Sequence, residues 1–270
     1  MNDNELLKLL PPVLRARDLH LYLEGGKRLT DLWLYGGKLL LGHKALGFIK
    51  EIKNNAERGL FSPLPHFQER RLLKALGSIF PGKTFRLYSD NTSLKKALND
   101  AGFEETSFPK EIRFPEEFPL WRPMMDETSA KAILAKKVFY PILPCPIGPE
   151  ILVINSELDS IFPEGDMIAP VILASCARSI FLLINSIKEG RPQNKKIDKA
   201  LKNSNWVRKG IYLFIDMQKM QDKGKTYKEV FCDFLEGGFL LPPTPKEPAI
   251  LPCLMSKGEE DKLAELLINP

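Results

Sequence analysis

A helix, a strand and a second helix follow one another in the first half of the chain, and this order constrains the fold more than any other feature. Apolar residues at helical spacing predict the first helix over 67–80, and Pro81–Gly82 ends it. The apolar run 85–88 predicts a strand, and the segment 92–101 predicts the second helix. A polar turn between a strand and a helix is the layout in which a helix N-terminus holds a phosphate.

The turn in this unit reads Ser89-Asp90-Asn91-Thr92-Ser93, with an acid at Asp90 and no glycine. A carboxylate about 4 Å from one phosphate charge costs on the order of 4 kcal/mol at an effective dielectric constant of 20. Aspartate is also a good N-cap residue, because its carboxylate accepts hydrogen bonds from free N–H groups of the helix that follows. We therefore expect Asp90 or Ser89 to cap the helix, and the acid to occupy the place of an anion.

The rest of the chain mixes short helices and strands, with strands near both ends. Paired glycines in the sequence EGGKR predict a turn between two strands within 19–33. Four prolines within 106–123 predict a long loop. Further helices are predicted within 1–17, and over 44–58, 128–136, 165–187, 195–203, 227–238 and 256–269, and further strands over 138–144, 150–154, 210–215, 239–243 and 249–255.

Charge and composition argue against several classes of function. The net charge is +5 and the basic residues are scattered, which argues against nucleic acid as the main partner. No segment reaches the roughly 18 apolar residues of a membrane-spanning helix, and 167–187 is interpreted as a buried helix. The N-terminus lacks the pattern of a secretory signal. We expect a cytoplasmic protein that does not bind a membrane.

The cysteines and histidines do not form a recognisable site. The four cysteines lie far apart, without a CxxC pair or a nearby histidine, which predicts reduced thiols and neither a metal site nor a disulfide framework. The motifs GxSxG, P-loop and HExxH are absent from the sequence. We therefore predict no catalytic residue and no metal ligand from the sequence.

Residues 19–83 resemble the N-terminal part of class III aminotransferases, the pyridoxal-phosphate (PLP) enzymes of fold type I. The matching features, in the family's order, are Leu29-Thr-Asp31, Leu41-Gly-His43, a helix to Arg58, Glu69 before Leu72–Leu73, and Pro81–Gly82. The resemblance makes His43 a packing and turn position. The C-terminal third is similar to the family's small domain, with Gly238, Leu241, Pro242 and Glu260–Asp261 at matching places.

This resemblance implies an α/β fold of the PLP-dependent-transferase kind, with a reduced large domain and a small α+β domain. The implied division is 1–58 for the N-terminal part of the small domain and a linker helix, 59–188 for the large domain, and 189–270 for the C-terminal small domain. In the family, the turn that corresponds to 89–93 binds the cofactor phosphate through backbone N–H groups around a glycine. Asp90 replaces that glycine, so Ser89, Asp90, Asn91, Thr92 and Ser93 are interpreted as a degenerate phosphate turn.

The residues that carry the family's chemistry are not recognisable in this sequence. The family places an Asp-Glu pair at the end of a buried strand and a Schiff-base lysine in a glycine-rich stretch, and only 101–169 remains for both. Asp126–Glu127 follows no apolar strand and is interpreted as a helix cap. Lys136 and Lys137 are interpreted as a solvated helix end.

We therefore expect a degenerate aminotransferase-like protein without PLP-dependent transamination and without a bound cofactor. One alternative is an active PLP-dependent transferase that uses an unrecognised lysine such as Lys137. Another is a non-catalytic module that binds a small ligand or a protein.

The family's two-fold dimer suggests one partner, a second copy of the chain. The segment 59–71 places Phe61, Leu64 and Phe67 in a loop stiffened by Pro63 and Pro65. Exposed apolar groups in such a loop favour an interface. We expect an isologous homodimer through this segment, whereas a loop folded back on its own domain would predict a monomer.

Overall fold

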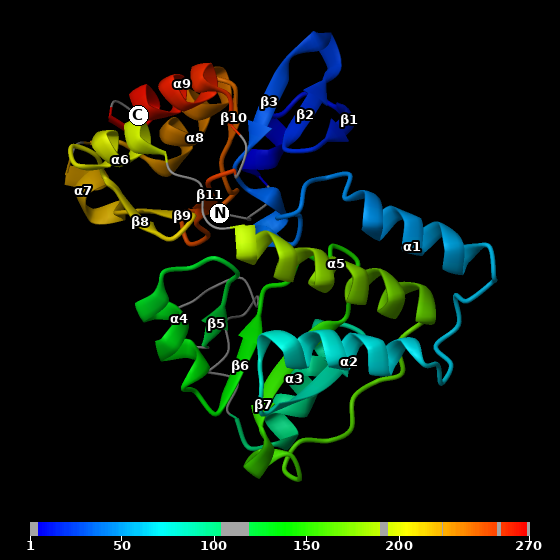
Figure 1. Ribbon diagram of the computed structural model, residues 1–270. Coiled ribbons are helices and arrows are strands. Elements are labelled where there is room, and N and C mark those ends of the chain that lie inside the picture. The colour runs from blue at the N-terminus through cyan, green and yellow to red at the C-terminus, as the bar shows by residue number, and fades with distance from the viewer. Residues whose placement is uncertain (1–4, 104–118, 190–193, 223, 253–254, 269–270) are drawn as a thin grey trace. The chain divides into compact units, whose positions relative to one another are not determined.

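The computed structural model of the chain describes residues 5–103, 119–189, 194–222, 224–252 and 255–268 (Figure 1). Contacts within the chain divide it into two compact units. Residues 1–37, 124–126 and 190–270 form one, called here the terminal unit, and residues 38–123 and 127–189 form the other, the central unit. Most of the loop predicted over 106–123 lies outside the described residues.

The terminal unit contains two sheets. The first has the strand order β1-β2-β3-β10, with β1 Val13–Arg17, β2 His20–Leu23, β3 Arg28–Asp31 and β10 Phe239–Leu240. Strands β1, β2 and β3 are antiparallel, whereas β10 lies parallel to β3. The second sheet is antiparallel in the order β11-β9-β8, with β8 Trp206–Lys209, β9 Tyr212–Ile215 and β11 Ala249–Ile250. The β3–β10 pair joins the N-terminal strands to the C-terminal third of the chain.

Helices of the terminal unit come from its C-terminal part. They are α6 Lys195–Leu201, α7 Met217–Asp222, α8 Tyr227–Glu236 and α9 Lys257–Ile268. Helix α8 begins with a capping box, in which Thr226 and Glu229 bond each other's backbone N–H groups. Its side chains Val230, Phe231 and Phe234 recur at helical spacing and are fully buried. The local sequence thus determines both the start of this helix and the face that it buries.

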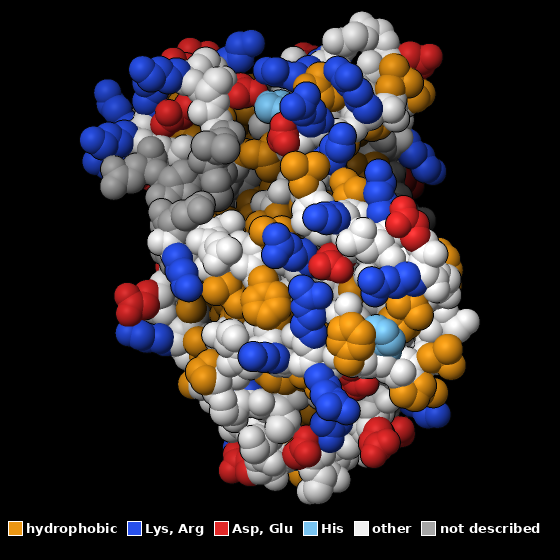
Figure 2. Space-filling model, turned by 45° about the vertical axis from the view of Figure 1, so that its right-hand side comes forward, with side chains coloured by type: hydrophobic (Ala, Val, Ile, Leu, Met, Phe, Trp, Pro, Cys, Tyr) orange, Lys and Arg blue, Asp and Glu red, His pale blue; other side chains and the backbone are white. Residues whose placement is uncertain are grey.

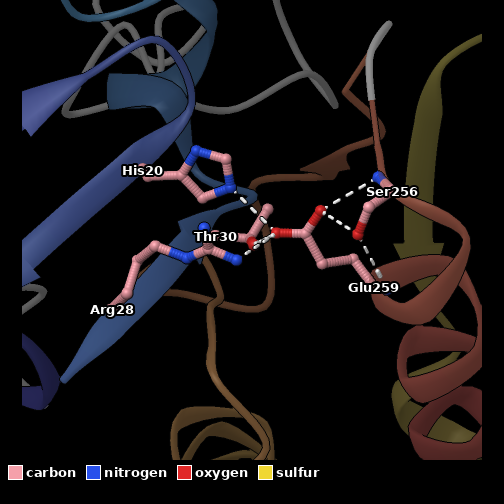
Figure 3. A network of polar contacts seen from close by, with 5 residues as sticks. All are labelled: His20, Arg28, Thr30, Ser256 and Glu259. Carbon is pink, nitrogen blue, oxygen red and sulfur yellow. Dashed lines mark hydrogen bonds and ion pairs between the residues drawn. The ribbon is translucent and has the colours of Figure 1, made fainter.

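A polar network links α9 to strands β2 and β3 within the terminal unit (Figure 3). One carboxylate oxygen of Glu259 accepts from His20 Nε2 at 2.8 Å, Thr30 Oγ1 at 3.0 Å and Arg28 Nη2 at 3.2 Å. The other oxygen accepts from the backbone N–H and hydroxyl of Ser256 at 2.9 and 2.7 Å. Burial opposes ionisation of Glu259, but the hydrogen bonds from Ser256, His20 and Thr30 outweigh it and lower its pKa to about 2. The Ser256 hydroxyl oxygen in turn accepts from the backbone N–H of Glu259 at 3.3 Å, which confirms the predicted cap at Ser256.

The central unit is built around a sheet with the strand order β4-β7-β6-β5. Its strands are β4 Lys83–Tyr88, β5 Leu120–Trp121, β6 Val138–Pro141 and β7 Glu150–Asn155. Strand β7 is antiparallel to β4 and β6, and β5 is parallel to β6. The helices are α1 Leu46–Ala56, α2 Gln68–Ile79, α3 Asn91–Asp100, α4 Glu127–Leu134 and α5 Pro170–Glu189. Single 3-10 turns occur at Leu6–Leu9, Glu24–Gly26, Leu34–Gly37 and Ser156–Leu158.

The central sheet is buried on both faces. Alternate residues of a strand point to opposite sides, so Leu152 packs with Leu94 and Leu98 of α3 on one side. On the other side the ring of Phe139 packs against Phe80, whose ring centroid lies 5.3 Å away. Burial on both sides explains why the residues of β7 from Ile151 to Ile154 are all apolar.

Helix α5 runs through the core of the central unit and contacts both α1 and α2. By length and composition alone, Pro170–Lys188 is apolar enough to cross a membrane, which is weak evidence because core helices pass the same test. Leu173, Ala174, Ala177 and Ile180 of this helix are almost completely buried. The buried helix predicted for 167–187 is confirmed in its core, but α5 begins at Pro170 and not at residue 165.

The structure differs from the sequence prediction at several elements. Strands β1, β5 and β8 and helix α7 were not predicted. Strand β5 lies within the segment 106–123 that was predicted as a loop, and it precedes Asp126, which was predicted to follow no apolar strand. Strand β1 is an edge strand whose mostly exposed residues give no alternating pattern. Residues 38–58 belong to the central unit because α1 packs on α5, whereas the sequence favoured a boundary after residue 58. In the part of the chain that the structure describes, His, Cys, Asp and Glu side chains form no group of three that could hold a metal ion.

Candidate functional site

The polar turn between β4 and α3 lies where the sequence predicts it. Strand β4 ends at Tyr88 and α3 begins at Asn91, so Ser89 and Asp90 connect the two elements. Asp90 has an extended backbone, and its Oδ1 accepts a hydrogen bond from the Ser93 N–H at 2.9 Å. The predicted N-cap is therefore confirmed as Asp90.

A second carboxylate, that of Asp166, reaches the same turn from a distant part of the chain. Its Oδ2 accepts from the backbone N–H of Ser89 at 2.8 Å and from the Ser89 hydroxyl at 2.7 Å. The Ser89 hydroxyl also lies 3.3 Å from the hydroxyl of Ser93. A backbone N–H and two hydroxyl groups at the start of a helix form the kind of donor set that binds an anion. In this protein the anion is a side chain.

Asp166 is held there by close packing of its backbone on β4. Its N–H donates to the carbonyl of Leu87 at 2.7 Å. A Cβ at Gly165 would lie 2.5 Å from that same carbonyl oxygen, so a larger residue would push the segment away from the strand. The sequence predicts a helix that starts at Gly165-Asp166, but these residues precede α5 and instead contact β4 and the turn. A glycine directly before an acid was the one available signal.

Electrostatics of the turn favour the ionised form of Asp166. The backbone N–H of Ser89, then its hydroxyl, lower the pKa of the Asp166 carboxyl, with a smaller contribution from the Ser93 hydroxyl. Burial raises the pKa of the neighbouring Tyr88 phenol to about 12; Arg86 opposes the rise and Asp166 adds to it. The turn therefore carries two acidic side chains, Asp90 and Asp166, beside a phenol that stays neutral.

The structure places the other predicted residues away from this turn in the sequence and in different elements. Lys136 and Lys137 are exposed between α4 and β6, as expected for a solvated helix end. Asp126 directly precedes α4, which starts at Glu127. His43 is partly buried and lines a small pocket of the central unit.

The cysteines are free thiols wherever they are described. Cys145 and Cys176 are buried beside each other in the central unit, where Cys145 Sγ lies 3.9 Å from the Cys176 carbonyl oxygen. Contact with Cys176 and burial raise the pKa of the Cys145 thiol. Cys232 is half-buried, and Cys253 lies outside the described residues. No disulfide joins any two of these three described cysteines.

Comparison with known proteins gives relatives of the whole chain. No family model matches it. A protein of Treponema pallidum, described as uncharacterized, is 26% identical over 93% of this chain and 92% of its own length. One of Borreliella burgdorferi, described in the same way, is 25% identical over 98% of this chain and 93% of its own length.

Solved structures similar to the chain include aminotransferases. Plasmodium falciparum ornithine delta-aminotransferase matches with a TM-score of 0.66 at 13% identity, over 96% of this chain and 92% of that one. This chain has an aminotransferase-like fold. An omega-transaminase from Sphaerobacter thermophilus matches equally well, with a TM-score of 0.66 at 11% identity over 96% and 90% of the two chains. The fold-type-I class predicted from the sequence is confirmed.

Because the fold is aminotransferase-like, the turn 89–93 can be compared with the family's cofactor-binding turn. The sequence resemblance assigns these residues to the place where the family holds its cofactor phosphate. Here Asp90 bonds to the N–H of Ser93, and Asp166 to the N–H and hydroxyl of Ser89. Two N–H groups and one hydroxyl that suit an anion thus already bond to carboxylates of the chain itself.

Proposed function

We propose that this protein is a degenerate member of the aminotransferase-like fold that does not carry out PLP-dependent transamination. The observation that carries the proposal is the pair of carboxylates, Asp90 and Asp166, bonded to the turn 89–93. A phosphate on this turn would have to displace them or lie beside them. If a carboxylate lies about 4 Å from the phosphate, the repulsion between the two is on the order of 4 kcal/mol for each pair of unit charges at an effective dielectric constant of 20.

The rest of the chain supports the same proposal. Transamination requires an amine that forms and exchanges an imine with the cofactor, and such a lysine is activated by desolvation or by neighbouring charge. Lys136 and Lys137, the pair considered from the sequence, are exposed in an irregular segment between α4 and β6. Exposure leaves an ammonium group fully hydrated, without the desolvation that activates such a lysine. Neither residue fits the role of the cofactor lysine.

A direct test combines binding, trapping and activity. The purified protein is incubated with PLP, reduced with borohydride and examined by intact-mass and peptide mass spectrometry, and aminotransferase activity is assayed with common amino donors. We expect no adduct above that of a surface-lysine control protein, and no activity. A stoichiometric adduct on one lysine, removed by substituting that lysine, would refute the proposal and support an active transferase instead.

We also propose that the protein forms an isologous homodimer through the segment 59–71. Phe61, Leu64 and Phe67 are 62%, 60% and 61% exposed in the single chain. Figure 2 shows a face on which hydrophobic side chains lie among lysines and arginines. Apolar groups that are exposed together on a loop favour an interface. The loop is anchored without these side chains, because the carbonyl of Leu60 accepts from Val171 N–H at 3.2 Å.

Light scattering at micromolar concentration tests the dimer. We expect a mass of twice one chain, and a single-chain mass after the double substitution Phe61→Glu and Phe67→Glu. The matched control is Val207→Glu, since Val207 is an exposed apolar residue of the terminal unit and lies outside this segment. A monomeric wild type would contradict the dimer, and a dimer that survives the double substitution would contradict the interface.

A further inference from the structure

A small pocket in the central unit contains a polar group that the fold leaves without a partner. Its cavity volume is about 90 Å³, and its apolar walls are Leu39, Leu41, Phe48, Ile49, Pro144 and Pro146. Three side chains that can form hydrogen bonds also line it: Lys38, His43 and Ser179. A mostly apolar cavity with a few polar groups is the usual form of a small-molecule site.

The Ser179 hydroxyl is the unusual feature of this pocket. Ser179 is 1% exposed, and among the described residues its Oγ has no hydrogen-bond partner. Ser175, one turn earlier on α5, shows what a buried helical serine normally does, because its hydroxyl donates to the carbonyl of Ile172 at 2.9 Å. A buried hydroxyl without a partner destabilises the folded protein. A bound molecule that bonds to Ser179 would remove that penalty.

Lys38 determines which charge such a molecule carries. Its ammonium donates to Glu150 at 3.2 Å, and this bond uses one of its three N–H donors. Glu150 also accepts from the Tyr140 hydroxyl. Because Glu150 offsets part of the Lys38 charge, and because the walls are apolar, a monoanion suits the pocket better than a phosphate dianion. A cationic ligand would be repelled by the ammonium.

We propose that this pocket binds a short aliphatic carboxylate. The carboxylate would accept from Lys38 and Ser179, and its hydrocarbon chain would lie against the apolar walls. The volume of the pocket limits the length of that hydrocarbon chain. An engineered cavity of about 150 Å³ holds benzene, and this pocket is smaller. None of the pocket's lining residues belongs to the turn 89–93. The proposal goes beyond the proposed function, because it holds whether or not the chain carries out PLP chemistry.

Calorimetric titration with butyrate tests the proposal, with butyramide as an uncharged molecule of the same shape. We expect saturable binding of butyrate to the wild type and at least about tenfold weaker binding of butyramide, because a hydrogen bond to a charged group is the stronger one. Ser179→Ala should weaken butyrate binding by about tenfold. This variant should fold normally, because the hydroxyl that it removes has no partner among the described residues.

Ser175→Ala is the matched control, since its hydroxyl is bonded within its own helix, and it should leave the affinity for butyrate unchanged. Lys38→Met should abolish binding, with its fold checked by thermal melting. The proposal is overturned if butyrate does not bind saturably to the wild type, if butyramide binds as tightly, or if Ser179→Ala binds butyrate as the wild type does.

Discussion

The N-termini of α9 and α3 both bond to carboxylates, but the two carboxylates differ in origin and surroundings. Glu259 belongs to α9 itself, is 15% exposed and accepts from His20, Arg28 and Thr30 as well as from its own cap. Asp166 comes from a segment far from α3 in the sequence, and it accepts from the N–H and hydroxyl of Ser89. Glu259 thus connects α9 to strands β2 and β3, whereas the Asp166 carboxylate bonds to the turn before α3.

This difference separates a contact that stabilises the terminal unit from a contact on which the proposed function rests. A helix that needs only a cap can take it from a neighbouring residue, as α3 does from Asp90. Asp166 adds a second acid to a turn that is already capped. An external anion would take the donors that Asp166 now uses, and for this reason we propose that Asp166 takes the place of the phosphate.

The largest loss of stability should follow from removing the Glu259 carboxylate, which connects α9 to β2 and β3. Glu259→Ala removes the N3 member of a capping box and three contacts to β2 and β3, and should lower the free energy of unfolding by about 2–3 kcal/mol. Urea unfolding followed by circular dichroism measures it. Glu265→Ala, at an exposed position of the same helix, should change stability by less than about 0.5 kcal/mol. Equal effects of the two substitutions would show that the network does not stabilise the terminal unit.

Acid should reduce the stabilisation that the ionised Glu259 carboxylate contributes. The pKa of Glu259 is lowered to about 2 from an ordinary 4.5. A lowered pKa means that the stabilisation is complete above the ordinary pKa and is lost as the pH falls towards 2. Urea unfolding at a series of pH values should therefore show wild-type stability falling below about pH 4.5. Glu259→Gln should fall less steeply over this interval, and parallel curves would contradict the assignment.

A smaller effect is expected at the turn of the central unit. Asp90→Ala removes the N-cap of α3 and should destabilise the protein by about 1 kcal/mol in the same assay. Asp90→Asn is the matched control, because asparagine caps about as well as aspartate and should leave stability nearly unchanged. If the alanine variant were as stable as the wild type, the cap would have no measurable role.

Local features of this comparison could be predicted from the sequence, and distant ones could not. Asp90 and Ser256 each stand directly before a helix, so the sequence alone predicts both caps. The contact between Asp166 and Ser89 joins residues 77 positions apart, and no local pattern reveals such a pair. Ser179 illustrates the same limit, because its neighbour Ser175 has the same type of side chain and only the structure separates their hydrogen bonding.

Phosphate binding at the turn is measured most directly by NMR, from the backbone amide resonances of residues 89–93 as inorganic phosphate is added. We expect no saturable shift of these resonances in the wild type, because the carboxylates of Asp90 and Asp166 already bond to the turn. The variant that combines Asp90→Gly with Asp166→Asn removes both charges and should show saturable shifts at the same amides. Saturable shifts of the wild-type Ser89 and Ser93 amides would contradict the proposal that Asp90 and Asp166 take the place of an anion, since the turn would then still bind one.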